Sequence, residues 1–248
     1  MAGAREWDAT SYDRVADPQA RWGAAVLERL PLNGDETVLD AGCGSGRVTE
    51  LLAERLPNGQ VVALDASAAM LEQAVGRLAR FAPRVTFVHA DLGRPLPPMP
   101  PLDAVLSTAV FHWIPDHDAL FRNLAAVLRP GGRLVAQCGG AGNVARFSAV
   151  VAQVTGDRGI ERTFATPEAT KRRLVAAGFS EIRCWLSAEP TRFEAGAAFE
   201  AFLETVCLRD HVEGLEPAAK AALARAVAEA MPEPLLDYVR LNIDAVKA

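Results

Sequence analysis

Lysine is scarce in this 248-residue chain, and no basic run is interleaved with aromatic residues. Only three of the 26 basic residues are lysines, the arginines are scattered, and the formal net charge is -5. A nucleic-acid interface needs a concentrated basic face that neutralises phosphates. The composition therefore argues against a nucleic-acid partner.

Cysteine pairs and long apolar runs are also missing. The four cysteines stand singly, so their spacing predicts neither a disulfide framework nor a zinc site. His112 and His117 are five residues apart, which does not place them on one helical face, and we assign no metal.

No apolar run reaches the ~18 residues of a membrane span. Because residues 1–8 are polar, we expect no signal peptide, no membrane contact and a cytoplasmic protein.

What the chain does have is an ordinary globular composition, with half of its residues apolar and 23% charged. Its length suits a single α/β domain over residues 1–248 with an appended lid. Residues 37–39 predict a strand, and Asp40 follows it directly. The next segment carries glycines at positions 42, 44 and 46 and leads into a helical pattern. Glycine tolerates positive φ and lacks a Cβ atom, so this loop is predicted to let a ligand approach the backbone closely.

The glycine spacing separates two classes of ligand. A dinucleotide fingerprint has the spacing G-x-G-x-x-G, whereas this loop has G-x-G-x-G. The carboxylate of Asp40 would repel a pyrophosphate and attract an ammonium or sulfonium group. The pattern therefore favours a cationic cofactor over the rival interpretation, a nucleotide-binding oxidoreductase.

At Asp40-Ala41-Gly42-Cys43-Gly44-Ser45-Gly46 the chain resembles the class I S-adenosylmethionine-dependent methyltransferases. The resemblance is strong over residues 36–138, which it identifies as the cofactor-binding core. It implies a Rossmann-like α/β fold with a doubly wound, mostly parallel, seven-stranded sheet. It also implies that S-adenosylmethionine is the cofactor and that the loop residues contact it: Asp40, Ala41, Gly42, Gly44 and Gly46.

Two later predicted strands also end on an acid. Residues 60–65 end at Asp65, and the strand over 85–90 is followed by Asp91. Asp65 lies about 20 residues beyond the glycines, where a βαβ unit places a carboxylate that can accept from ribose hydroxyls. Because the carboxyl ends of parallel strands meet at one sheet edge, Asp40, Asp65 and Asp91 predict a single site. The resemblance implies further cofactor contacts on this edge: Ala66, Ser67, Met70, Leu92 and Ser107.

The methyl acceptor is expected beside residues 109–115, because in the fold that the resemblance implies this segment passes the sulfonium. We assign Val110, His112 and Trp113 to the acceptor site. His112 is also the candidate catalytic base, since histidine titrates near neutral pH. The alternative is a solvated or structural core histidine.

Aromatic residues concentrate ahead of the glycine loop, in residues 1–30, where residues 17–30 predict a helix. The segment before this helix has a turn-forming composition, and we interpret it as a lid that folds over the ligand. Tyr12 is assigned to the cofactor and Trp7 to the acceptor. Packing of the segment onto the sheet is the alternative.

Helical patterns between the last two predicted strands form an insertion over residues 187–237, expected to cover the acceptor pocket. This insertion and the segment 112–117 resemble the trans-aconitate methyltransferases, which esterify a carboxylate on a small acid. The resemblance implies transfer to an oxygen of a small molecule, carboxylate or hydroxyl. Methylation of carbon or nitrogen, or a non-catalytic S-adenosylmethionine-binding protein, stays open, as do monomer and homodimer.

A tricarboxylate acceptor would call for arginines that face the pocket. The sequence offers several candidates without showing where they point: Arg146, Arg158, Arg162, Arg192 and Arg209.

Overall fold

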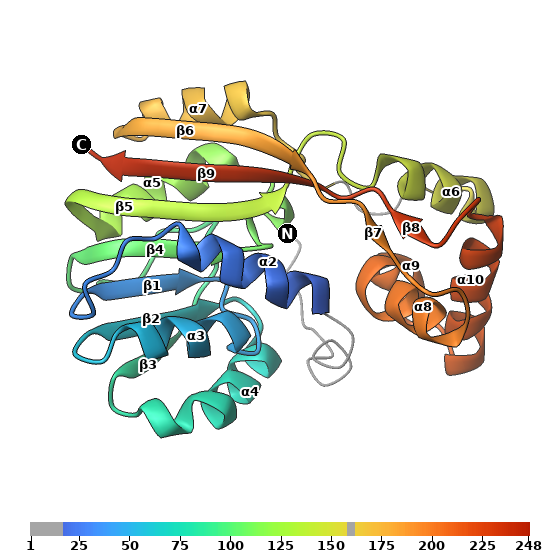
Figure 1. Cartoon of the computed structure of the whole chain (residues 1–248), viewed down its shortest axis with the longest axis horizontal. Helices are drawn as coiled ribbons and strands as arrows, with labels where there is room; N and C mark the ends of the chain where they lie inside the picture. The colour runs from blue at the N-terminus through green and yellow to red at the C-terminus, as the bar shows by residue number, and fades with distance from the viewer. Residues whose placement is uncertain (1–16, 158–161) are drawn as a thin grey trace.

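A seven-stranded sheet forms the centre of the computed structural model, which describes residues 17–157 and 162–248 (Figure 1). Its order is β3-β2-β1-β4-β5-β9-β6, and β9 runs opposite to the other six strands. The mostly parallel sheet predicted above is therefore confirmed. The strands are β1 (Thr37–Ala41), β2 (Gln60–Asp65), β3 (Val85–His89), β4 (Leu102–Thr108), β5 (Leu128–Gly139), β6 (Phe179–Ala188) and β9 (Val239–Lys247).

Helices cover both faces of this sheet (Figure 1). Val38 and Leu39 are adjacent in β1 and fully buried, yet they belong to different apolar clusters, because successive strand residues point to opposite faces. The cluster of Val38 includes residues of α2, α3 and α4, and the cluster of Leu39 includes residues of α5 and α7. These helices are α2 (Asp17–Glu28), α3 (Arg47–Arg55), α4 (Ala68–Leu78), α5 (His117–Val127) and α7 (Pro167–Ala176).

Side-chain caps mark the starts of three helices. Ser67 accepts a hydrogen bond from the Met70 N–H at the start of α4, and Asp116 accepts one from the Ala119 N–H at the start of α5. Thr166 caps α7 in the same way. Such caps stabilise a helix by about 1 kcal/mol each, because they satisfy N–H groups that have no partner within the helix.

The fifth strand is longer than predicted. The sequence placed it from residue 133, after a helix-ending turn over residues 129–132. In the structure β5 begins at Leu128, which pairs with Leu102, and the register then shifts so that Arg133 pairs with Ala104. Residues 129–132 of β5 therefore have no paired partner in β4 and form a bulge, which accommodates the extra residues of β5.

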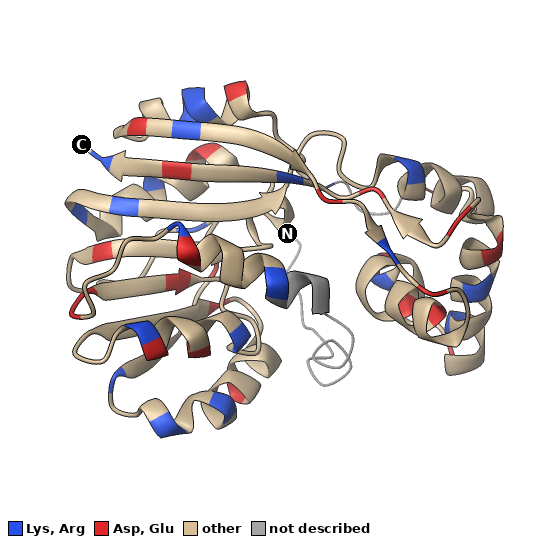
Figure 2. Cartoon of the chain, viewed as in Figure 1, with Lys and Arg blue, Asp and Glu red and all other residues tan. Residues whose placement is uncertain are grey.

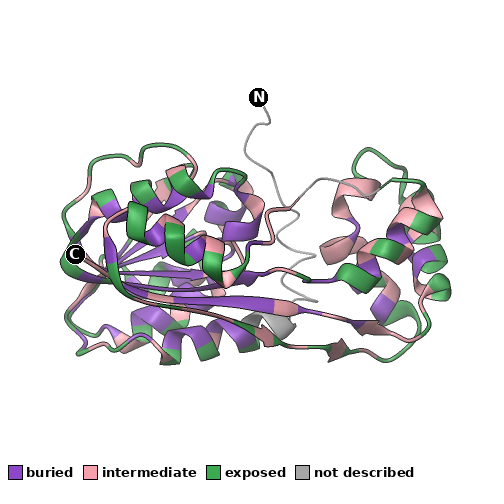
Figure 3. Cartoon of the chain, turned by 90° about the horizontal axis from the view of Figure 1, so that it is seen from above, coloured by how far each residue is buried: buried purple, intermediate pink, exposed green. Residues whose placement is uncertain are grey.

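A helical cap stands beyond the carboxyl ends of the parallel strands (Figure 1). It contains most of the expected insertion over 187–237, together with α6, which precedes it and packs into the same apolar cluster. The insertion also includes a two-stranded sheet that the sequence did not predict. Figure 3 shows buried residues in both the sheet body and the cap. The cap elements are α6 (Ala145–Thr155), α8 (Ala197–Phe202), the π-helix η3 (Leu203–Cys207), α9 (Arg209–Val212), α10 (Pro217–Ala230), β7 (Thr191–Arg192) and β8 (Leu235–Leu236).

Acidic and basic residues are interspersed over the sheet body and the cap (Figure 2). Across residues 17–157 and 162–248, none of the helices combines the length and the apolar character that crossing a membrane requires.

Phe121 of α5 offers a test of the packing that supports the cavity described below. It is fully buried, and its ring meets the ring of Phe111 edge to face at 5.9 Å. Phe121→Ala should lower the free energy of unfolding by about 3–5 kcal/mol, because it leaves a core void. The control Val75→Ala, at a position 49% exposed, should change it by less than about 0.5 kcal/mol. Equal effects in urea unfolding would contradict this packing.

Candidate active site

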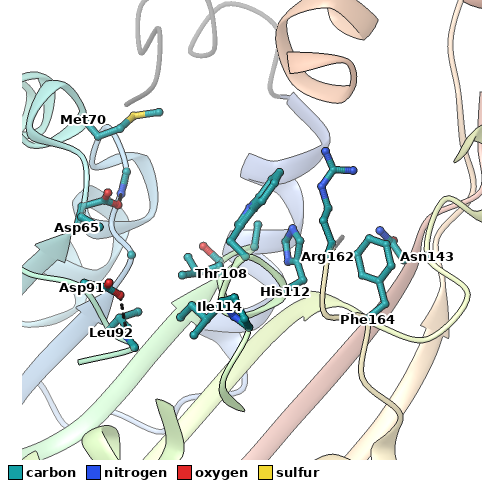
Figure 4. A pocket seen from close by; sticks show the side chains of 18 of the residues that line it. Asp65, Met70, Asp91, Leu92, Thr108, His112, Ile114, Asn143, Arg162 and Phe164 are labelled. Carbon is teal, nitrogen blue, oxygen red and sulfur yellow. Dashed lines mark hydrogen bonds between the residues drawn. The ribbon is translucent and has the colours of Figure 1, made fainter. Parts of the chain in front are cut away.

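A cavity of about 590 Å³ lies where the parallel strands end and the cap begins (Figure 4). This volume is typical of sites for small ligands. Residues that follow β1, β2, β3 and β4 line one part of it, and residues of α6, η3 and β9 line another. The predicted sheet-edge site is therefore a real hollow, enclosed by elements distant in the sequence.

The glycine loop after β1 forms part of the wall. The N–H groups of Gly42 and Cys43 donate to the Leu64 carbonyl at 2.8 and 2.9 Å, which ties the loop to β2. Gly42 and Gly44 line the cavity with φ of +82° and +54°. A Cβ atom on Gly44 would stand in open space, so glycine here keeps the backbone open to a ligand.

Asp65 is the carboxylate that organises this edge. One of its oxygens accepts from the Gly44 N–H at 2.8 Å, and the other accepts from the Ser67 N–H at 2.9 Å. Asp91 follows β3 and also lines the cavity, with one oxygen on the Gly93 N–H at 2.8 Å. The structure thus brings together two of the three acids that the sequence predicted to share a site.

Asp40, the third acid, points away from the cavity. It is 1% exposed, accepts a hydrogen bond from the Thr49 hydroxyl at 2.7 Å, and burial raises its pKa to about 7. The predicted attraction of a cation by a fully ionised Asp40 therefore does not match its surroundings. Burial and the hydrogen bond from Thr49 instead make this group a structural contact between β1 and α3.

The predicted cofactor and acceptor residues divide into two sets. Those that line the cavity are Gly42, Gly44, Asp65, Ala66, Met70, Asp91, Leu92, Val110, His112 and Trp113. Ala41, Gly46, Ser67 and Ser107 do not line it and have structural contacts instead. The Ser107 hydroxyl donates to the Ala41 carbonyl at 2.7 Å, and a Cβ atom on Gly46 would contact α4. Trp7 and Tyr12 lie outside the described residues.

The His112 ring is buried in the cavity wall. Its Nδ1 accepts a hydrogen bond from the Gly139 N–H at 3.2 Å, so the proton of the neutral ring lies on Nε2. Burial, and then the nearby Arg240 and Arg162 guanidinium groups, hold the pKa of His112 well below its usual value. A neutral imidazole in this tautomer is a hydrogen-bond donor at Nε2, which argues against the role of general base expected from the sequence.

Arg162 lines the cavity beside His112. Its guanidinium lies over the Trp113 ring at 4.6 Å and forms an ion pair with Asp210 of the cap at 3.2 Å. Of the other candidate arginines, Arg146 and Arg192 are exposed and pair with Glu233. Arg209 does not line the cavity, and Arg158 lies outside the described residues.

Arg240 is a cavity residue that sequence reasoning missed. It is 3% exposed, its guanidinium lies over the Trp22 ring at 4.6 Å, and its Nε donates to the Gln137 side-chain oxygen at 3.4 Å. Its position was a usable signal, because a charged residue between apolar neighbours in a central strand is rarely buried without a purpose. The other cavity residues absent from the predictions include Thr108, Asn143, Phe147, Phe164 and Tyr238.

The two parts of the cavity differ in charge, as Figure 4 shows. Asp65 and Asp91 lie on the side of β2 and β3, and Arg162 lies on the far side of His112. Arg240 belongs to β9, which pairs with β5 on that same half of the sheet. The two acids and the two buried arginines therefore lie in different parts of the cavity, and the exposed Arg94 on the acidic side pairs with Asp91 at 3.7 Å.

Comparison with known proteins agrees with this geometry. Residues 38–132 match the family described as methyltransferase domain. The trans-aconitate 2-methyltransferase of Methylobacterium nodulans is 36% identical over 261 residues, which cover 97% of this chain and 98% of the relative. The chain belongs to the class I S-adenosylmethionine-dependent methyltransferases. A second methyltransferase, named trans-aconitate 2-methyltransferase in Methylobacterium radiotolerans, is 32% identical over 98% of this chain and 99% of its own.

A solved methyltransferase structure supports the fold. Phosphoethanolamine N-methyltransferase 2 of Haemonchus contortus, in complex with phosphomonomethylethanolamine and S-adenosylhomocysteine, superposes with a TM-score of 0.66. The match covers 96% of this chain and 56% of that chain at 21% identity, so it bears on the fold alone.

The residues of this methyltransferase fit S-adenosylmethionine as cofactor. Asp65 and Asp91 offer acceptors for hydroxyl and amine groups, and the bare backbone at Gly44 leaves room beside them. Met70 and Leu92, both buried, line the cavity and would offer apolar contact to a flat ring. Within the described residues, no group of three His, Cys, Asp or Glu side chains gathers as a metal site requires.

Gly44→Ala tests the glycine wall. The new methyl group would project into the cavity from a left-handed backbone position, which disfavours residues with a Cβ atom by about 1–2 kcal/mol. We expect at least tenfold weaker binding of S-adenosylmethionine by calorimetry. Gly76→Ala is the matched control, since it lies in α4 with open space around it, and it should leave binding unchanged. Normal affinity in a folded Gly44→Ala protein would contradict the assignment.

The buried Asp40 predicts a pH dependence of stability. Because its pKa is about 7 in the folded protein and about 4 when unfolded, the folded state binds more protons between these values. Stability contributed by this site therefore falls as pH rises from about 4 to 7 and then levels off. Relative to wild type, Asp40→Asn should gain roughly 2–3 kcal/mol between pH 5 and 8. Urea unfolding at several pH values measures this difference in stability between the variant and wild type. If the difference is the same at pH 5 and pH 8, Asp40 is already ionised at pH 5.

Proposed function

We propose that this methyltransferase esterifies a carboxylate of a small polycarboxylic acid, with trans-aconitate, named in its relatives, as the first acceptor to test. The observation that carries the proposal is the pair of arginines in one cavity. Arg162 and Arg240 line the same hollow as His112, and both lie close enough to lower its pKa. An arginine guanidinium binds carboxylates through paired hydrogen bonds, which makes this arrangement suited to more than one acid group.

The surroundings of the arginines favour anion binding. Trp113 lies beneath Arg162 and Trp22 beneath Arg240, so aromatic faces restrict both guanidinium groups to defined planes. Both side chains are largely withdrawn from water, which strengthens their attraction for an anion. Asp210 holds Arg162 from the cap side and so fixes its position, at the cost of partly neutralising it.

The chemistry of a carboxylate acceptor matches the state of His112. A carboxylate is already ionised at neutral pH, so its oxygen can attack a methyl group without losing a proton. When bound, S-adenosylmethionine supplies that methyl group on a positively charged sulfur. His112 donates from Nε2 to an oxygen of the acceptor, and Arg162 and Arg240 bind the acceptor's remaining carboxylates. The aromatic wall, including Phe147 and Phe164, excludes water and aligns the reactants.

Arginine substitution tests acceptor recognition. Arg162→Met and Arg240→Met should each raise the KM for trans-aconitate by about 10- to 100-fold, since each removes a charge-assisted contact worth about 1.5–3 kcal/mol. The KM for S-adenosylmethionine should stay within twofold. Arg192→Met is the control, because that exposed arginine pairs with Glu233. Methyl ester formation is followed by mass spectrometry. Turnover of alcohols or amines, with none of carboxylic acids, would overturn the proposal.

His112→Ala separates acceptor classes. If the acceptor is a carboxylate, kcat should fall by less than about tenfold, whereas loss of a general base costs about 10²–10⁴-fold. Because the pKa of His112 lies well below its usual value, its ring stays neutral from pH 6 to 8. The wild-type pH profile of kcat/KM should therefore show no histidine inflection in this range. An inflection that disappears in the variant would restore the role of base.

A further inference from the structure

A line of buried polar side chains lies between α2 and the strands β5 and β9. At the cavity end, Arg240 donates from Nε to the side-chain oxygen of Gln137 at 3.4 Å. Gln137 then donates from Nε2 to the side-chain oxygen of Asn242 at 2.9 Å, and Arg29 donates to that same oxygen. Gln137 and Asn242 are also directly paired residues in the β5–β9 ladder. The line therefore links a cavity residue to the far end of α2.

Helix geometry explains why these groups coincide. Trp22, in the middle of α2, packs over Arg240, and Arg29 follows directly after the end of the helix. Seven residues of helix span about 10 Å, and the strand segment from Arg240 to Asp244 spans about 13 Å. Arg29 also forms an ion pair with Asp244 at 3.2 Å. Trp22 of α2 and Arg29 after it therefore contact the polar line at its two ends.

The direction of every hydrogen bond in this line follows from Arg29. A guanidinium can only donate, so the Asn242 atom that it contacts must be the oxygen. The Asn242 amide nitrogen then points to the Ser187 hydroxyl at 3.1 Å. Gln137 must present its nitrogen to the Asn242 oxygen, and its own oxygen is consequently turned toward Arg240. A flipped Gln137 amide would place a donor against a donor.

We propose that Gln137 is a positioning residue for acceptor binding, which orients the Arg240 guanidinium toward the acceptor carboxylate. This inference rests on the proposed function. The Trp22 face sets the plane of the guanidinium, and the Gln137 oxygen sets its rotation within that plane. These two constraints orient the N–H groups of the Arg240 guanidinium already in the free enzyme. Less conformational entropy is therefore lost when the acceptor binds.

Gln137→Met tests the inference in the full-length enzyme. It keeps the length of the side chain but removes the acceptor, so Arg240 should lose its fixed rotation. We expect the KM for trans-aconitate to rise about tenfold, while kcat and the KM for S-adenosylmethionine stay within twofold. If that variant does not fold, Gln137→Asn keeps an amide but withdraws it by one methylene, and the same split is expected.

Ser187→Ala is the matched control. It removes a hydrogen bond at the Asn242 amide nitrogen and leaves the side that faces Gln137 intact. Its acceptor KM should equal that of wild type, and an equal rise in both variants would show general loosening and overturn the inference.

A crystal structure of Gln137→Met provides a readout that needs no acceptor. The Arg240 guanidinium should leave its wild-type position, and an unmoved guanidinium would overturn the positioning role. Failure of wild-type enzyme to esterify any carboxylic acid would instead reject the proposed function, and the Arg240 position would still decide the role of Gln137.

Discussion

The carboxylate of Asp65 joins the two backbone segments on which the cofactor half of the cavity depends. Its oxygens accept the N–H of Gly44, in the loop after β1, and the N–H of Ser67, which begins α4. Both segments would otherwise expose unpaired backbone donors at a sheet edge. Because one side chain satisfies both, the glycine loop and the helix start are held beside the groups that would bind a ribose. Asp65 thus supports the cavity wall and also lines the cavity.

The part of the cavity proposed for the acceptor depends on a different constraint, the burial of positive charge. Arg162 and Arg240 are placed against indole rings, and each has a polar partner, Asp210 or Gln137. Burying a cation is costly unless such contacts replace its lost water. The replacement leaves a positive field in a low-dielectric hollow, where an anionic group gains more than it would at the surface. In the function proposed above, this difference in charge would orient the cofactor and the acceptor toward one another.

His112 shows how the same residue type acquires a different chemistry from its surroundings. A histidine on a loop beside a cofactor suggests a base by residue type alone. The Gly139 N–H fixes its tautomer and the two arginines disfavour its protonation, which together leave a neutral donor. An ionised acceptor needs alignment more than proton removal, so this state is consistent with carboxylate esterification.

Local pattern determined the strand, loop and helix units of this protein, because hydrophobic period, glycine position and caps such as Ser67 act over a few residues. It also placed Asp65 and Asp91 at one edge, since parallel strands share the direction of their ends. Only the tertiary structure decided that Asp40 turns inward to Thr49 and that Arg240 reaches the cavity. The first outcome depends on which face of β1 meets α3, and the second depends on contacts of Arg240 with residues more than a hundred positions earlier in the chain. Spacing along the chain does not encode either of them.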